Sequence, residues 1–226
     1  VSMITTDEIE LIKQVLPFWE NLTNIQQNFL TEHSFSSSYQ KGQELLSNEN
    51  ECIGVLILKK GNIRAYITSE EGREITIYRM EHHDVCILSA SCVLQTIDFH
   101  VFVHAESDCE IIQISVPAFL KLTNDNIYVE LFSYKLATER FADMMWAMQQ
   151  ILFTSFDKRL ATFLMEETTR ENTDTLHMTH EQIAKYMGSA REVVSRMLNY
   201  FAKEGYVTLS RGTIQIIDFD KLKQLI

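Results

Sequence analysis

Residues 191–196 place several hydrogen-bonding side chains close together, and their types suit the edges of DNA base pairs. They are Arg191, Glu192, Ser195 and Arg196. An arginine can donate two hydrogen bonds to O6 and N7 of guanine, a glutamate can accept one from N4 of cytosine, and a serine can reach several base edges or a phosphate. Such residues near the start of a helix are typical of a helix that enters the major groove.

The flanking sequence predicts two short helices that would position these side chains. Thr179 and Gln182 have the spacing of a capping box at the start of the first helix, and Gly188 can supply the tight turn before the second. Asn199 falls on the same outer face as the polar residues. The apolar side chains expected to be buried are Ile183, Ala184, Met187, Val193, Val194, Met197, Leu198 and Phe201. This pattern predicts a helix-turn-helix.

A β-hairpin is predicted after the second helix and would form a wing beside it. Its strands are residues 206–209 and 213–217, and Arg211 lies in the turn between them. An arginine at the tip of a wing can contact a DNA phosphate. The full set of candidate DNA-binding residues is Arg191, Glu192, Ser195, Arg196, Thr179, Ser189, Asn199 and Arg211.

A purely structural role would explain part of the same pattern. Ser189 and Glu192 also have the spacing of a capping box, in which Glu192 would only close the start of the second helix. Arg196 follows Glu192 by four residues, so the two side chains could form a solvated ion pair. The sequence leaves both alternatives open.

A much longer helix is predicted over residues 126–154. Its apolar residues recur at alternating steps of three and four, as in the seam of a two-stranded coiled coil. The seam comprises Leu131, Tyr134, Thr138, Phe141, Met145, Met148 and Leu152. At about 1.5 Å per residue this helix would be about 40 Å long, so we expect it to pair two copies of the chain. The alternative is packing on the chain's own sheet, for which Val129, Phe132 and Leu136 offer a second apolar face.

The region before this helix is rich in short β-strand patterns. Residues 1–33 read as helices, whereas residues 35–116 contain several strand-like runs separated by turn signals such as Lys60-Gly61-Asn62. Short strands at regular spacing predict an antiparallel sandwich, barrel or jelly roll. The chain therefore divides into expected domains of residues 1–125, 126–156 and 157–226.

The distribution of charge separates these regions. The 226-residue chain is 46% hydrophobic and has a net charge of −11, which alone would argue against a nucleic-acid partner. Residues 1–156 hold 10 Lys/Arg and 21 Asp/Glu, whereas residues 157–226 hold 10 of each. The acidity thus lies outside the predicted helix-turn-helix, and an asymmetry of this kind indicates domains with different partners.

The segment from Gly188 to Arg196 resembles the recognition helix of the cyclic-AMP receptor protein / fumarate–nitrate regulator (Crp/Fnr) family of bacterial transcription factors. The resemblance covers nearly the whole chain and implies an α+β fold: a double-stranded β-helix (jelly-roll, cyclic-nucleotide-binding-like) sensor domain, a long dimerisation helix and a winged helix-turn-helix. It implies that Glu192 and Arg196 read bases. Ser195 matches the fumarate–nitrate branch and Arg191 the cyclic-AMP branch, so TTGAT-like and TGTGA-like half-sites both stay open.

The resemblance also implies a homodimer that binds a palindromic site in double-stranded DNA under the control of an effector, with RNA polymerase as a candidate partner. Cyclic-AMP binders of this family carry a Gly-Glu-Leu turn and an Arg-Ser pair. This chain has Cys86-Ile87-Leu88-Ser89 and Phe99-His100 in those places, and a buried phosphate without its arginine is costly. Cyclic AMP is therefore disfavoured. The iron–sulfur cysteine cluster of the other branch is absent too, because the first cysteine is Cys52.

The candidate effector or redox residues are Cys86, Cys92, Ser89, Ser91 and His100. The two cysteines could form a redox-active pair or, with nearby histidines, a metal or haem site. The serines could instead open a short helix that receives a small anion. Cysteines and histidines also commonly just pack in a core. The cofactor is left unknown, and no metal site is assigned.

The sequence also bears on other classes of protein. The apolar stretches are too short to cross a bilayer, and the start of the chain does not read as a secretory signal. The four cysteines then favour a reducing cytoplasm, with no membrane partner. We expect a transcription regulator with no catalytic residues. The alternatives are a metal-dependent cupin-type β-barrel enzyme that uses the histidines, and a regulator that needs no small effector.

Overall fold

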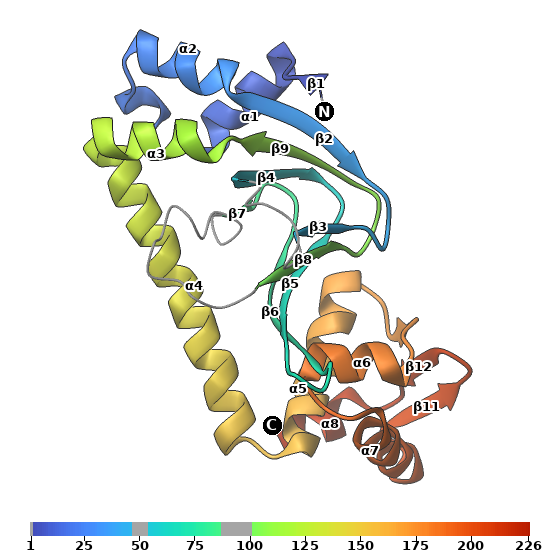
Figure 1. Cartoon of the computed structure of the whole chain (residues 1–226). Coiled ribbons are helices and arrows are strands. Elements are labelled where there is room, and N and C mark those ends of the chain that lie inside the picture. The colour runs from blue at the N-terminus through green and yellow to red at the C-terminus, as the bar shows by residue number, and fades with distance from the viewer. Residues whose placement is uncertain (1, 47–53, 87–100) are drawn as a thin grey trace. The chain divides into compact units, whose positions relative to one another are not determined.

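The computed structural model describes residues 2–46, 54–86 and 101–226 (Figure 1). The chain forms two compact units, one of residues 1–67 with 77–144 and the other of residues 68–76 with 145–226. The domain boundaries expected from the sequence, at residues 125/126 and 156/157, stay a prediction.

The first unit is an antiparallel β sandwich, which confirms the predicted sheet architecture. One sheet has the strand order β1-β2-β9-β4-β7 and the other β3-β8-β5-β6. The strands are β1 (Ser2–Met3), β2 (Ser34–Tyr39), β3 (Glu44–Leu46), β4 (Val55–Lys60), β5 (Ile63–Thr68), β6 (Glu74–Met80), β7 (Val85–Cys86), β8 (Phe102–Ala105) and β9 (Cys109–Ile114).

Alternation along the strands builds two layers of core. In β4, Leu56 and Leu58 pack between the two sheets, against residues such as Val103. The intervening Val55 and Ile57 pack on the other face, against the helices. A strand buried on both faces reads as a continuous apolar run, because successive side chains point to opposite sides of the sheet.

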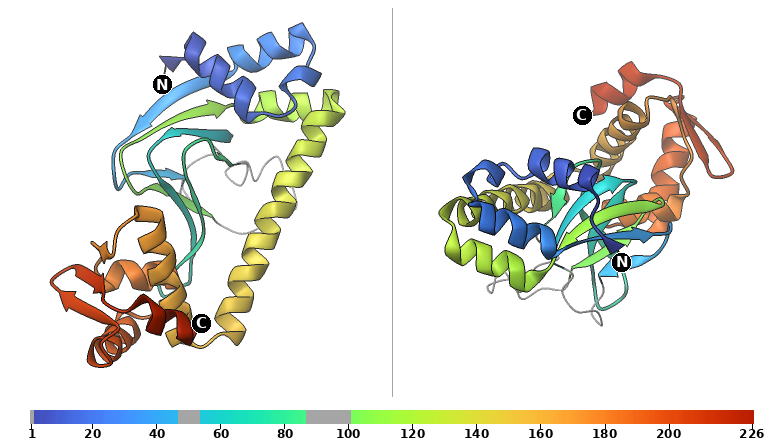
Figure 2. Two further views of the ribbon diagram at one scale, coloured as in Figure 1. Left: turned by 180° about the vertical axis from the view of Figure 1, so that it is seen from behind. Right: turned by 90° about the horizontal axis from the view of Figure 1, so that it is seen from above.

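Four helical segments contribute to the second of these layers. They are α1 (Thr6–Val15), the 3₁₀ turn η1 (Trp19–Asn21), α2 (Asn24–Glu32) and α3 (Val116–Asp125), and they lie along the five-stranded sheet (Figure 2). The sequence starts both N-terminal helices with capping boxes: the Thr5 hydroxyl accepts from the Glu8 N–H, and the Thr23 hydroxyl accepts from the Gln26 N–H. Pro117 lies in the first turn of α3, where a missing N–H costs nothing.

The predicted long helix is α4 (Ile127–Phe153). Val129 and Leu136 are buried in the same core as the N-terminal helices, and Phe132 packs against it. The second apolar face predicted for this helix therefore does pack on the chain's own fold. Among the described residues, no helix is long and apolar enough to cross a membrane.

The second unit contains the predicted helix pair and hairpin. Its elements are α5 (Phe156–Glu171), β10 (Thr175–Leu176), α6 (His180–Met187), α7 (Arg191–Lys203), β11 (Val207–Ser210), β12 (Thr213–Ile216) and α8 (Phe219–Leu225). One apolar core joins α5, α6, α7, the hairpin and α8. The sequence did not predict β10, which pairs with β12 and gives a sheet in the order β10-β12-β11. Two residues are too short a run to show a strand period.

Candidate nucleic-acid interface

The turn between α6 and α7 forms as the sequence predicts. The Thr179 hydroxyl accepts a hydrogen bond from the Gln182 N–H at 3.2 Å, and the Gln182 Oε1 accepts one from the Thr179 N–H at 2.8 Å. Gly188 ends α6 in the left-handed region, at φ 60° and ψ 39°, which a residue without Cβ adopts readily. The capping box thus fixes the start of α6, and Gly188 fixes its end, so that only a short turn separates α6 from α7.

The apolar face of α7 fixes which side chains face outward. Val194, Leu198 and Phe201 are fully buried in the core of the unit. Val193 and Met197 were predicted to be buried but are only partly so, because they lie at the margins of this face. The opposite face is left to polar residues.

These polar residues line a depression of about 460 Å³ on the outer side of α7, which we call the reading face. Its residues are Arg191, Glu192, Ser195, Arg196 and Asn199. All five were predicted as DNA-binding residues, and the structure brings them together. All are exposed except Ser195, which is half-buried.

The structural alternatives for Glu192 are not realised. Helix α7 begins at Arg191 with Ala190 as its N-cap residue, and no side chain caps it, so Ser189 and Glu192 do not form a capping box. Within the described residues, no ion pair joins Glu192 to Arg196. The two side chains are therefore available to an external partner.

A second depression, of about 520 Å³, lies between the wing and the starts of α6 and α7, and we call it the wing groove. Thr179, Arg191 and Arg211 line it, as does His180, which was not predicted from the sequence. His180 directly follows the capping residue Thr179, and this position at the start of a helix could have identified it as a candidate for phosphate binding. Ser189 was also predicted to bind DNA, but it lies in the turn and is part of the lining of neither depression.

The charges of the two depressions favour an anionic partner. None of Arg191, Arg196 and Arg211 makes an ion pair with any residue that the structure describes. Burial and the positive charge of Arg191 both hold the pKa of His180 below its ordinary value of 6.5. A group of arginines without internal partners, beside the start of a helix, is a ready site for phosphate oxygens.

The predicted effector residues are mostly outside the described part of the chain. Ser89, Ser91, Cys92 and His100 all lie there, and only Cys86 is described. Cys86 is buried, and its Sγ lies 2.6 Å from the hydroxyl oxygen of Tyr78 on β6. Burial beside this sulfur raises the pKa of Tyr78 well above its ordinary value.

Tyr78 also connects Cys86 to the long helix. The guanidinium of Arg140, on α4, lies 4.8 Å from the centre of the Tyr78 ring, within the range of a cation–π contact. Arg140 in turn forms an ion pair of 2.7 Å with Asp143 on the same helix. Within the described residues, no group of three or more His, Cys, Asp or Glu side chains could hold a metal ion.

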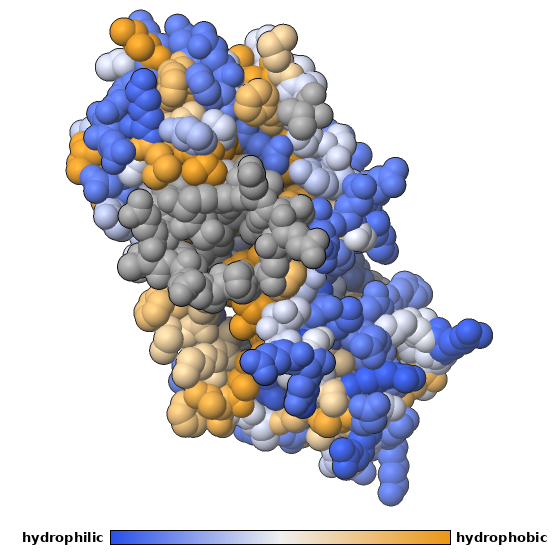
Figure 3. Space-filling model, viewed as in Figure 1, coloured by the Kyte–Doolittle hydropathy of each residue, from blue (hydrophilic) through white to orange (hydrophobic). Residues whose placement is uncertain are grey.

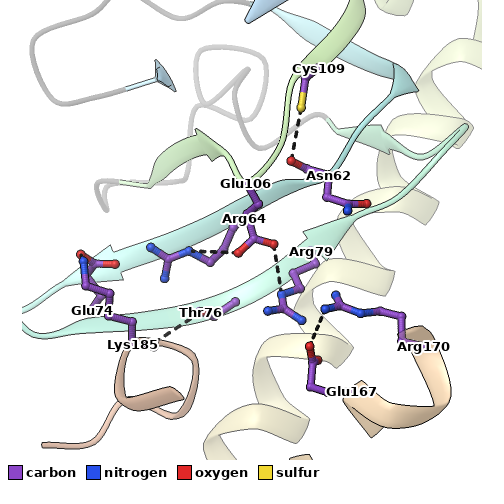
Figure 4. Close-up of polar contacts among 10 residues, drawn as sticks. All are labelled: Asn62, Arg64, Glu74, Thr76, Arg79, Glu106, Cys109, Glu167, Arg170 and Lys185. Carbon is purple, nitrogen blue, oxygen red and sulfur yellow. Dashed lines mark hydrogen bonds and ion pairs between the residues drawn. The ribbon is translucent and has the colours of Figure 1, made fainter. Parts of the chain in front are cut away.

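A cluster of charged groups on the sandwich was not predicted from the sequence. Glu106 lies between two arginines, with its carboxylate 3.9 Å from Nε of Arg64 and 3.4 Å from Nε of Arg79 (Figure 4). Arg64 is only 4% exposed and stacks on the ring of Tyr66 at 4.2 Å. Strand alternation identifies which residues share a face, but it does not show that polar residues on that face will be covered.

The seam predicted on α4 is exposed along most of its length. Between 42% and 60% of the residue surface is accessible at six of its seven positions and at the adjacent Ile151. The six are Leu131, Tyr134, Phe141, Met145, Met148 and Leu152. In the space-filling view, hydrophobic residues gather over the end of this helix, whereas the wing side is hydrophilic (Figure 3).

A β sandwich followed by a long helix and a winged helix-turn-helix defines a DNA-binding transcription regulator. The comparisons agree: the cyclic nucleotide-binding domain family matches residues 36–126, and the Crp-like helix-turn-helix family matches residues 158–225. The chain belongs to the Crp/Fnr family of transcription regulators. Membership of this family makes it a regulator and not the cupin-type enzyme considered as an alternative.

The similarity to individual proteins ranges from nearly the whole chain to about a third of it. The crystal structure of a Crp/Fnr regulator from Eubacterium rectale is 41% identical, covers 94% of this chain and 98% of that one, and has a TM-score of 0.91. Regulatory protein HlyX of Actinobacillus pleuropneumoniae is 25% identical over 81% of this chain and 78% of its own. Transcriptional regulatory protein Btr of Bordetella pertussis is 35% identical, but the match spans 31% of this chain and 32% of Btr.

Proposed function

We propose that this chain acts in the cytoplasm as a homodimer that binds a palindromic DNA site through α7. Arg191, Glu192, Ser195, Arg196 and Asn199 would contact base edges in the major groove, and Thr179 and Arg211 would hold backbone phosphates, with Ser189 beside them. The observation that carries this proposal is the reading face, where the polar residues meet and the arginines have no ion-pair partner among the described residues.

The exposed seam of α4 supports the homodimer. A row of large apolar side chains left in water is costly, and a second copy of the same helix would cover it. A two-fold axis along the seam would present two reading faces, so the DNA site should be a palindrome whose half-sites lie about one helical turn apart.

Control would come from the β sandwich. An effector or a redox change near Cys86 would act on α4 through Tyr78 and Arg140, because these groups form a continuous chain of contacts. Such an event changes DNA binding only if it favours the DNA-competent state of the dimer over the other state. RNA polymerase stays a candidate partner by family resemblance.

The test is selection of duplexes from a random pool by the purified chain, in reduced and oxidised form. We expect a palindrome with TTGAT-like or TGTGA-like half-sites. Affinity for that palindrome is then measured by fluorescence anisotropy for Arg196→Ala and for Lys223→Ala, which removes an exposed cation from α8. Arg196→Ala should weaken binding by about 1–3 kcal/mol, and Lys223→Ala should leave it within about twofold. Equal losses in both variants would contradict base reading by Arg196.

A further inference from the structure

His180 is a titratable group that lines the wing groove but takes no part in the reading face. It is the first residue of α6, it is half-buried, and it lines the wing groove together with Arg191 and Arg211. The side chain thus belongs to a groove built from two helix starts and a hairpin turn, with two arginines that have no ion-pair partner among the described residues.

The surroundings of His180 disfavour its charged form in the free protein. The charged or titratable side chains that line the groove are His180 and Glu181 from α6, Arg191 from α7 and Arg211 from the wing. His177 lies next to the wing, with its Nδ1 3.4 Å from the Thr213 hydroxyl. Burial and Arg191 together lower the pKa of His180, and the positive end of the α6 dipole acts in the same direction.

A phosphate in the wing groove would reverse this balance. Its charge offsets that of Arg191 and of the helix dipole, and its oxygens accept hydrogen bonds from a protonated imidazole. The protein without DNA would therefore hold His180 neutral at a pH at which the complex holds it charged. A proton must then be taken up when the complex forms.

We propose that DNA binding by this chain is coupled to protonation of His180, so that affinity falls as pH rises. The inference rests on the proposed function, because the DNA backbone supplies the phosphate. The sign follows from linkage: the pKa of His180 is higher in the complex than in the free protein, and affinity falls only in the range of pH between the two values. Since each protomer of the dimer takes up one proton, the fall is at most about 100-fold per pH unit for the dimer, or about tenfold per half-site.

The test measures affinity at constant ionic strength from pH 5.5 to pH 8.5, using fluorescence anisotropy and the selected palindrome as a labelled duplex. Three variants are compared with the wild type: His180→Gln has no titratable ring, His180→Arg keeps a cation at every pH, and His177→Gln is the matched control. Calorimetry in two buffers with different ionisation enthalpies measures proton uptake by the wild type directly.

If the proposal is right, we expect four results. The wild type and His177→Gln lose affinity as pH rises, and the wild type takes up about one proton per protomer on binding. His180→Gln binds weakly with a flat profile, and His180→Arg stays tight at pH 8.5 with a flat profile. The inference is wrong if both His180 variants keep the wild-type dependence of affinity on pH, or if the wild type takes up no proton. Either result leaves the proposed function intact. If neither the wild type nor His177→Gln binds any selected duplex at any pH, the proposed function itself fails.

Discussion

Two groups of charged side chains, one in each unit of this protein, are placed in opposite ways. In the first unit, an ion pair is largely covered: Glu8 on α1 is 4% exposed, and Lys59 lies 2.6 Å from its carboxylate and 3.1 Å from that of Glu110. In the winged unit, Arg196 and Arg211 are exposed and make no ion pair with the residues that the structure describes. Charges of the first kind stabilise the fold, whereas those of the second kind are available to bind another molecule.

This difference explains why net charge is a poor guide to function here. The sandwich and long helix account for the whole net charge of −11, and several of the acidic groups there serve internal ion pairs. Residues 157–226 have no net charge, yet they present arginines to solvent at defined places. Binding depends on where uncompensated charge lies, and not on the sum over the chain.

The largest expected effect lies in the sandwich. Replacing Glu8 with Gln removes the buried anion that accepts hydrogen bonds from Lys59 and from the Ser36 hydroxyl, and leaves the ammonium group of Lys59 less compensated. We expect the free energy of unfolding at pH 7 to fall by about 3 kcal/mol, measured by urea denaturation. The affinity of this variant for the selected palindrome should stay within about twofold of the wild-type value. A change in affinity as large as that in stability would break the contrast between the units.

The same ion pair predicts a dependence of stability on pH. Burial alone would raise the pKa of Glu8, but the hydrogen bonds from Lys59, Ser36 and Thr5 outweigh it and lower the pKa from 4.5 to about 2. A lowered pKa means that the stabilisation is complete above pH 4.5 and is lost as pH falls toward 2. The wild type should lose stability over this range more steeply than Glu8→Gln, and equal slopes would contradict the assignment.

The next effect tests whether α4 pairs two copies of the chain in a dimer. Phe141 is 60% exposed on the seam, so Phe141→Glu should leave the monomer folded but place two like charges opposite each other in a dimer. We expect monomers in sedimentation experiments and a loss of operator affinity of about 100-fold, because two linked reading faces bind far more tightly than one. Glu139→Lys, also exposed on α4 but off the seam, is the control. A dimeric Phe141→Glu variant would place the dimer contact elsewhere.

A smaller effect concerns the base that Glu192 reads. Its carboxylate can accept a hydrogen bond from cytosine, so Glu192→Ala should relax discrimination at one base pair of each half-site by about 1–3 kcal/mol. Competition assays with duplexes altered one base pair at a time measure this. Affinity should fall on the selected site but not on duplexes already altered at that pair. A uniform loss over all duplexes would mean that Glu192 serves the fold of α7 instead.

The winged unit could be predicted nearly residue by residue because its signals are local. The capping box at Thr179, the turn at Gly188 and the helical period of α7 all lie within one short segment, and the reading face follows from them. The exact extent of burial could not be predicted from the helical period. The burial of Val193 and Met197 depends on how closely neighbouring elements approach them.

The sandwich could be predicted only as a class of fold. Its Ser-rich strand β2 carries none of the β-branched residues that mark strands, and it forms because it pairs with β9, far away in the sequence. The contact between Cys86 and Tyr78 and the covered pair of Arg64 and Glu106 likewise depend on which strands become neighbours. Such groups leave no periodic signal in the sequence.

The smallest effect distinguishes phosphate contacts from base contacts within the winged unit. Arg211 lies at the tip of the wing, so Arg211→Ala should weaken binding to all duplexes alike, by about 1 kcal/mol at moderate salt. The plot of log affinity against log salt concentration should become shallower by about two units for the dimer, because each protomer loses one phosphate contact and its released counterion. Glu192→Ala should leave that slope unchanged. If Arg211→Ala alters base preference but not the salt slope, then Arg211 reads sequence, and the wing belongs to the reading face.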